Sequence, residues 1–267
     1  DANTQMLALE NNEVDVLINA GLDQVLKLDT SKGFKYDITQ GAGFIDVKFN
    51  CNNGLTKNEA FRKAVASAIN REDINIALYE GYSEETPVYG CPFFSGYPEK
   101  GTFTEPYPFD TEAAKKYLEE SGYNGEEFII IVQQGTKAEA AAVIIQGAMI
   151  NLGVTCTVKT LDGASKNALR KALDGWNAEV VVQTANAMDL IASRLYNSYR
   201  YNAAINGTLC MADDPELDDL YDEAMDMLDT DERDAVFGKI QDILNGKVYD
   251  LPLVIDLNCS ASHDWVE

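Results

Sequence analysis

A strand–helix–strand pattern in the middle of the chain constrains the fold more than any other feature. Residues 128–132 (FIIIV) are a short apolar run, residues 137–152 predict a helix that ends at Gly153, and residues 154–160 alternate apolar and polar side chains. A crossover through one helix makes the two strands parallel, and such crossovers are right-handed. The pattern therefore predicts an α/β fold in which this helix covers one face of a sheet.

Further helices and strands flank this unit on both sides. A Thr-x-x-Glu capping box at Thr56 and Glu59 predicts the start of one helix, and Asp110 is expected to cap another. The complete expectation is strands at residues 14–18, 43–50, 128–132, 154–160, 179–182 and 251–257, and helices that begin near residues 7, 59, 72, 110, 137, 164, 189, 215 and 230.

Residues 82–108 interrupt this regular pattern. They contain five prolines interleaved with aromatic residues, which excludes a regular helix. The segment is therefore predicted to be a long loop. Two interpretations stay open: its aromatic side chains pack across the surface, or the loop is functional.

Charge and the length of the apolar runs exclude several classes of partner. Forty-four acidic residues against 21 basic residues give a net charge of -23, which repels polyanions, so we expect no nucleic-acid partner. The ordinary interpretation of this acidity is a well-solvated surface. The longest apolar runs, such as residues 128–132, are far below the roughly 20 residues that span a bilayer. We therefore expect no transmembrane segment.

No motif in the chain carries recognisable chemistry. His263 is the only histidine and stands in no nucleophile motif, and the five cysteines are dispersed without a Cys-x-x-Cys pair. The acidic run at residues 213–219 lacks the spacing of a calcium loop, and Pro215 at the start of a helix explains it better. We predict no enzyme activity, no cofactor and no metal site. A hydrolase that uses one carboxylate pair is the alternative that the sequence leaves open.

Four stretches, in the same order, resemble family 5 of the ABC-transporter extracellular solute-binding proteins, the oligopeptide, dipeptide and nickel-binding class. Residues 6–16 (MLALENNEVDV) resemble the family's ALxxGEIDV segment, and residues 58–72 (NEAFRKAVASAINRE) resemble its DxRVRQAIxxAIDRE helix. Residues 109–123 (FDTEAAKKYLEESGY) are similar to YDPEKAKxLLxEAGY, the most specific of these segments. The acidic helix at residues 214–220 and the strand at residues 251–253 (LPL) complete the match.

The resemblance implies a type II periplasmic-binding-protein-like α/β fold, in which two lobes close over a ligand. Residues 1–49 are then the end of the first lobe and a hinge strand, and residues 50–250 are the second lobe, the α/β ligand-binding domain. Residues 251–267 return toward the first lobe. The long N-terminal part of the family is absent from this chain, so we expect a C-terminal portion that binds ligand weakly or not at all by itself.

One departure from the family concerns the ligand site. In peptide-binding members a strand end of the form W-x-x-D-x-x-x-P supplies an Asp for the α-amino group of the ligand; the matching stretch here reads QTANAMDL. Asn186 falls where that Asp would stand, so the charge-assisted contact is weakened unless Asp189 replaces it. We expect ligand contacts from Asn50, Gln183, Thr184, Asn186 and Asp189. Turn and N-cap roles are the alternative for Asn186 and Asp189.

The implied function is that of the solute-binding component of an ABC importer. Such a protein captures a peptide or another small polar solute between its lobes and delivers it to the permease. The resemblance also implies a monomer with an extracytoplasmic location, in the periplasm or as a cell-surface lipoprotein, and membrane contact only through a lipid anchor outside this chain. A ligand sensor or surface interaction module on the same fold is the alternative.

Overall fold

The core of the protein is one six-stranded mixed sheet with the strand order β1-β6-β2-β5-β3-β4. The computed structural model describes residues 2–99, 102–184, 190–198, 200–201, 212–228 and 230–266. The strands are β1 (Val16–Ile18), β2 (Phe34–Phe49), β3 (Phe128–Gln133), β4 (Cys156–Leu161), β5 (Ala178–Thr184) and β6 (Asp250–His263).

The helices are distributed along the whole chain. Those of the first half are α1 (Ala2–Glu10), α2 (Leu22–Val25), α3 (Glu59–Ala68), α4 (Arg71–Tyr79) and α5 (Thr111–Glu120), with the short 3-10 turns η1 (Thr30–Lys32) and η2 (Leu55–Lys57). Those of the second half are α6 (Lys137–Leu152), α7 (Gly163–Ala172), α8 (Arg194–Asn197), α10 (Pro215–Asp226) and α11 (Thr230–Gly246), with the 3-10 turn η3 (Leu190–Ser193). Among the described residues no helix is long and apolar enough to cross a membrane.

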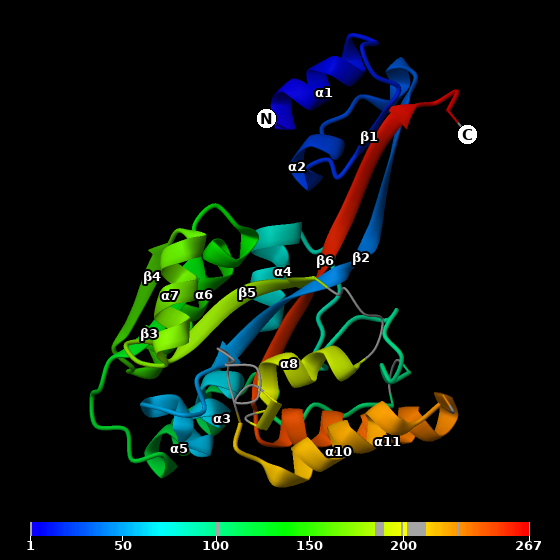
Figure 1. Cartoon of the computed structure of the whole chain (residues 1–267). Coiled ribbons are helices and arrows are strands. Elements are labelled where there is room, and N and C mark those ends of the chain that lie inside the picture. The colour runs from blue at the N-terminus through cyan, green and yellow to red at the C-terminus, as the bar shows by residue number, and fades with distance from the viewer. Residues whose placement is uncertain are drawn as a thin grey trace.

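Two long strands connect the two ends of the molecule. β2 and β6 pair antiparallel from Phe34↔His263 to Lys48↔Asp250, with register shifts between Gln40 and Phe44 and again beside Ile45. At about 3.4 Å per residue, the 16 residues of β2 extend about 50 Å. Figure 1 shows α1, α2 and β1 at one end of this ribbon, with both chain termini, and the other helices at the opposite end.

The predicted strand–helix–strand unit is confirmed. β3 and β4 are parallel, with Phe128 opposite Cys156, and α6 has the predicted bounds. Gly153 ends α6 in a left-handed conformation (φ +93°), which glycine adopts without steric cost. The chain then returns through α7 to β5, which is parallel to β3.

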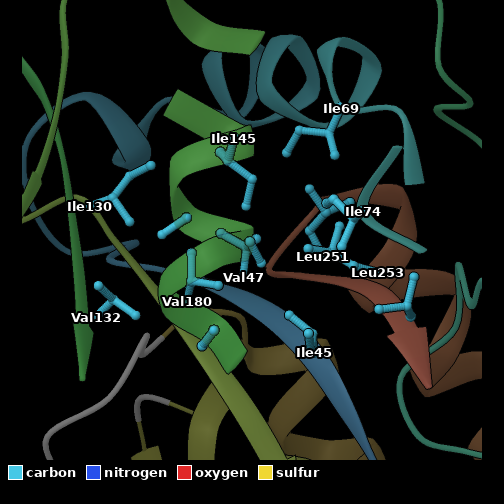
Figure 2. Close-up of a cluster of buried hydrophobic side chains, with 14 of the residues drawn as sticks. Ile45, Val47, Ile69, Ile74, Ile130, Val132, Ile145, Val180, Leu251 and Leu253 are labelled. Atoms are coloured by element: carbon cyan, nitrogen blue, oxygen red, sulfur yellow. The ribbon is translucent and has the colours of Figure 1, made fainter. Parts of the chain in front are cut away.

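Each face of the sheet has its own apolar core. Ile45 and Val47 of β2 and Val180 of β5 pack with Ile145 of α6 in one buried cluster, as Figure 2 shows. Phe44 is next to Ile45 in the strand and therefore points to the other face, where it packs in a second cluster with helices α10 and α11. Because both faces are covered there, the second half of β2, at residues 43–49, is fully buried.

The loop at residues 82–108 forms no helix or strand within its described residues, and an isolated bridge between Glu85 and Val254 joins it to β6. Two of its aromatic residues belong to the second core: Tyr89 and Phe94 both lie edge-on to Phe44. The packing interpretation of this loop is therefore confirmed for these two rings.

Two capping predictions have different outcomes. Asp110 caps α5, because its Oδ1 accepts hydrogen bonds from the amides of Glu112 (2.9 Å) and Ala113 (3.0 Å). The cap at Thr56 is wrong: α3 is capped by Asn58, whose Oδ1 accepts from the amide of Ala60 at 2.9 Å. Thr56 is buried instead, with its hydroxyl oxygen 2.8 Å from the carbonyl oxygen of Asn50.

The predicted lobe boundaries near residues 50 and 250 fall at two positions that are adjacent in the sheet. Lys48, near the end of β2, is opposite Asp250, the first residue of β6. The division of residues 1–49, 50–250 and 251–267 into lobes stays a prediction.

Candidate functional site

The carboxyl end of β5 carries two of the predicted ligand residues. Gln183 is opposite Phe44 and Thr184 is opposite Gly43, so both lie beside the register shift of β2. Gln183 is buried (8% exposed). Asn186 and Asp189 follow this strand end in the sequence but lie outside the described residues.

Asn50 lies beside the opposite, N-terminal end of β5, and its side chain forms hydrogen bonds within the chain. Phe49 pairs with Ala178, six residues before Thr184, which places Asn50 about 20 Å from Thr184 at the rise of an extended strand. The Asn50 side chain is fully buried, and its Nδ2 donates to the carbonyl oxygens of Leu173 (3.2 Å) and Trp176 (3.3 Å). The structure therefore does not bring Asn50 together with Gln183 and Thr184.

The segment after the predicted ligand residues is packed against α10. The hydroxyl groups of Ser193 and Tyr221 are 2.6 Å apart, and Ser193 also donates to the carbonyl oxygen of Leu190 at 2.6 Å. Ser193, Asn197 and Tyr221 are fully buried. Residues 190–198 are thus held by the second core on the side that faces away from α6.

A buried charge cluster, formed by Asp46, Lys48 and Asp250, lies under this segment. The Lys48 Nζ is 2.6 Å from Oδ2 of Asp46 and 2.9 Å from Oδ1 of Asp250. All three side chains are at most 2% exposed. The remaining oxygen of Asp250 accepts a hydrogen bond from Nδ2 of Asn197. The cluster therefore joins β2, β6 and α8 at one point.

The electrostatic balance of the buried charge cluster favours proton uptake. One ammonium faces two carboxyl groups in a water-excluded site, and Asp46 Oδ1 has no hydrogen-bond partner among the described residues. Burial, the largest cause, raises the pKa of Asp46 to about 7; the nearby Asp250 raises it further and Lys48 opposes the rise. The Asp46 carboxyl group therefore keeps its proton to a much higher pH than a free Asp side chain does.

A second buried ion group lies beside the first. Glu179 of β5 is opposite Lys48 in the sheet, so both side chains point to the same face. Its carboxylate contacts Lys166 Nζ at 2.7 Å and Arg170 Nη1 at 3.1 Å, both from α7. Because α6 packs on Val180, the neighbour of Glu179, α6 and α7 cover opposite faces of the sheet.

Sequence reasoning missed the buried charge cluster, although one signal was available. Asp46 and Lys48 are two apart in an otherwise apolar strand, which puts both on one face. Their partner Asp250 is 202 residues away from Lys48 in sequence and is brought to them only by the pairing of β2 with β6.

A pocket opens beside the register shift of β2. It has a volume of about 800 Å³ and lies between Gln40 and the loop, with Ser83, Glu85, Tyr97 and Phe103 among its lining residues. It lies on the β6 side of β2, whereas Gln183 and Thr184 lie on the β5 side. The pocket and the predicted ligand residues are thus on different sides of the hinge strand.

The chemistry available among the described residues is that of binding by polar contacts. Burial raises the pKa of the Cys51 thiol to about 11 and that of Cys156 to about 12, so both are thiols at neutral pH and weak nucleophiles. No group of three or more His, Cys, Asp or Glu side chains is placed to hold a metal ion in the part of the chain that the structure describes.

The fold and the site together define a class of protein. An α/β unit with both sheet faces covered is joined to a second, smaller part of the chain by two long neighbouring strands, and the polar strand end lies beside them. This is the architecture of the type II periplasmic binding proteins, in which hinge strands connect lobes that close around a solute.

Comparison with known proteins identifies the family. The model of bacterial extracellular solute-binding proteins, family 5 Middle, matches residues 1–206. The chain therefore belongs to family 5 of the bacterial extracellular solute-binding proteins, a family of binding proteins and not of enzymes.

Individual relatives are distant and longer. The glutathione-binding protein GsiB of Escherichia coli (strain K12) is 22% identical over 275 residues, which cover 98% of this chain and 52% of that protein. Heme-binding protein A of Haemophilus influenzae is 22% identical over 265 residues, with 95% and 46% covered. The chain thus spans about half the length of the curated relatives it matches.

A solved structure has the same fold. The ABC transporter-associated periplasmic binding protein DppA from Helicobacter pylori, in complex with the peptide STSA, superposes with a TM-score of 0.84 at 22% identity. The match covers 100% of this chain and 52% of DppA. At this level of identity the likeness establishes the type II fold of the chain.

Proposed function

We propose that the chain is the part of an ABC-importer solute-binding protein that contributes the second lobe and the hinge strands. The solute is captured at the carboxyl end of β5, by Gln183, Thr184 and the following residues, and is then delivered to the permease. The observation that carries the proposal is the position of this strand end directly beside the register shift of β2, where the chain passes from one part of the molecule to the other.

Ligand capture follows from a two-state equilibrium of the hinge. A solute that contacts both lobes binds the closed state more tightly than the open state, and therefore shifts the population toward closure. The pairing of β2 with β6 shifts register between Gln40 and Asp46. A bulge interrupts the ladder of hydrogen bonds, so these shifts support the proposal that the two strands bend there.

The proposed ligand is a peptide or another small polar solute. Peptide-binding members of the family have a carboxylate where this chain has the amide of Asn186, and an uncharged amide binds an α-amino group more weakly. We propose that Asp189, the nearest carboxylate in the sequence, takes over this contact. We assign ligand contacts to Gln183, Thr184, Asn186 and Asp189. We assign no ligand contact to Asn50, because its Nδ2 and Oδ1 already have partners within the chain.

The proposed partners and location follow from the family. The protein acts as an extracytoplasmic monomer that docks on permease subunits, and a lipid anchor outside this chain provides any contact with the membrane. The net charge of -23 supports the exclusion of nucleic acid as a partner.

The proposal is tested by thermal-shift screening of the full-length gene product. The compounds are glutathione, the tetrapeptide Ser-Thr-Ser-Ala, heme and a nickel–histidine chelate, each at millimolar concentration or at its solubility limit. A compound present at 100 times its Kd adds about 2.7 kcal/mol to the stability of the native state, which is a shift of several degrees in Tm. Absence of a shift with every compound class, including longer peptides and sugars, contradicts the proposal.

A further inference from the structure

The pocket between Gln40 and the loop at residues 82–108 lies apart from the proposed solute site. Its volume of about 800 Å³ is within the range of cavities that hold small organic molecules. It opens on the β6 side of β2, whereas Gln183 and Thr184 lie on the β5 side. A molecule in this pocket therefore occupies a different place from a solute at the carboxyl end of β5.

One wall of the pocket is held in place by hydrogen bonds. Asn75 of α4 and Ser83 exchange two of them: Asn75 Nδ2 donates to the carbonyl oxygen of Ser83 at 2.8 Å, and the amide of Ser83 donates to Asn75 Oδ1 at 3.2 Å. Glu84 and Thr86 then form backbone hydrogen bonds with β6, each 2.9 Å long. A ligand therefore meets a wall that is already ordered, which lowers the entropic cost of binding.

The remaining walls of the pocket offer rings and aliphatic surface. The Tyr97 hydroxyl is 3.1 Å from the hydroxyl of Thr86, so this ring is held against the ordered wall. The other apolar lining residues are Phe103, Pro87, Val88, Pro92 and Pro98. Aromatic rings attract cations through their faces, and aliphatic surface favours an apolar body.

The charged groups that line the pocket all have one sign. Its described lining residues include no Lys, Arg or His but three carboxylates, which belong to Glu84, Glu85 and Glu99. Partial burial, the largest cause, raises the pKa of Glu85, and the nearby Glu72 raises it further, whereas Arg71 opposes the rise. Arg71 is itself buried and forms an ion pair with Glu105. A bound cation beside Glu85 therefore relieves repulsion between like charges, and an anion is disfavoured.

We propose that this pocket is a second ligand site, which binds a small organic cation with an apolar body, such as an arylalkylamine. The ammonium group lies against Glu85, and the apolar body lies against Tyr97 and Phe103. None of these residues belongs to the proposed solute site, so the inference does not depend on the proposed function.

The first test is isothermal titration of the full-length gene product with phenethylamine and with phenethyl alcohol, which replaces the ammonium group by a neutral hydroxyl. We expect the amine to bind at one site per molecule, and the alcohol to bind at least about fivefold more weakly. Equal affinity for the two compounds, or no binding of the amine at millimolar concentrations, overturns the inference.

The second test locates the site, because a net charge of -23 attracts cations to the whole surface. Glu85→Gln keeps the size of an exposed side chain and removes its charge. The control is Glu119→Gln, which makes the same change in net charge at an exposed position of α5 outside the pocket.

We expect phenethylamine to bind about fivefold more weakly to Glu85→Gln and within about twofold of wild type to Glu119→Gln. Unfolding midpoints equal to that of wild type show that both variants are folded. Equal weakening in the two variants, or unchanged affinity in Glu85→Gln, overturns the inference because the amine is then attracted by the overall charge or bound elsewhere.

Discussion

Replacement of Asp46 by Asn should remove a pH dependence from the stability of the protein. The Asp46 carboxyl is completely buried, and its pKa is raised from 3.8 to about 7, mainly by burial. The folded state therefore binds this proton more tightly than the unfolded state. A raised pKa of a carboxyl group makes the stability greatest below about pH 4, and the stability falls as the pH rises toward 7 and is constant above it.

The magnitude follows from the shift of the pKa. A pKa that rises from 3.8 to about 7 corresponds to about 4 kcal/mol of stability lost between pH 4 and pH 8, because each tenfold change in the acid equilibrium is worth about 1.4 kcal/mol. Asp46→Asn does not titrate but keeps an oxygen for the contact with Lys48, so its stability relative to wild type should rise with pH by up to about 4 kcal/mol.

The assay is urea denaturation followed by circular dichroism at intervals between pH 4 and pH 8, for wild type and variant. Carboxyl groups remote from the buried charge cluster have the same surroundings in both proteins, so their contributions cancel in the difference. Asp37→Asn is the control for the loss of one carboxyl group, because Asp37 is an exposed residue of the same strand and lies outside the buried charge cluster. Parallel stability curves for wild type and Asp46→Asn would refute the reasoning.

Three further predictions concern other parts of the chain. Asn50→Ala should lower the free energy of unfolding by about 1–3 kcal/mol, because the carbonyl oxygens of Leu173 and Trp176 lose their hydrogen-bond donor, and it should leave ligand affinity unchanged. A loss of affinity without a loss of stability would instead show that Asn50 contacts the ligand. Ile145→Ala should cost about 2–5 kcal/mol in urea denaturation because α6 fills the first core with this side chain, and a cost below 1 kcal/mol would contradict that packing. Burial raises the pKa of the Cys156 thiol to about 12, so Cys156 should not react with iodoacetamide at pH 8 in the native protein but should react after denaturation. Mass spectrometry measures the labelling, and rapid labelling of the native protein would show that the thiol is accessible.

Local sequence patterns were sufficient for the βαβ unit. The apolar run of β3, the helix ended by Gly153 and the alternation in β4 are each encoded within a few residues, and the short crossover fixes how they pair. Asp110 is likewise a local signal, since an N-cap bonds to amides two and three residues ahead.

Features that depend on pairing between distant parts of the chain were not predicted from the local sequence. The extent of β2 was underestimated: the prediction began at residue 43, although residues 34–39 (FKYDIT) alternate apolar and polar side chains, and pairing with β6 extends the strand back to Phe34. The buried charge cluster unites Lys48 with a residue 202 positions later. Thr56 and Asn58 were both acceptable caps by residue type, and only the contact of Thr56 with the Asn50 carbonyl decides between them.

The predicted ligand residues divide in the same way. Gln183 and Thr184 are consecutive residues at the end of one strand, whereas Asn50 is separated from them by the length of β5. Asn50 is recognisable as a loop-bonding residue only when Leu173 and Trp176, more than 120 residues later, are placed around it.

In the proposed function, a solute is captured at the carboxyl end of β5, beside the two hinge strands. The most direct measurement is a crystal structure of the full-length gene product with the compound that gives the largest thermal shift. We expect the bound compound to contact Gln183 or Thr184 together with residues 185–189, and the first lobe to close over it. A compound bound elsewhere, such as in the pocket between Gln40 and Phe103, with residues 183–189 free of contact, would contradict it.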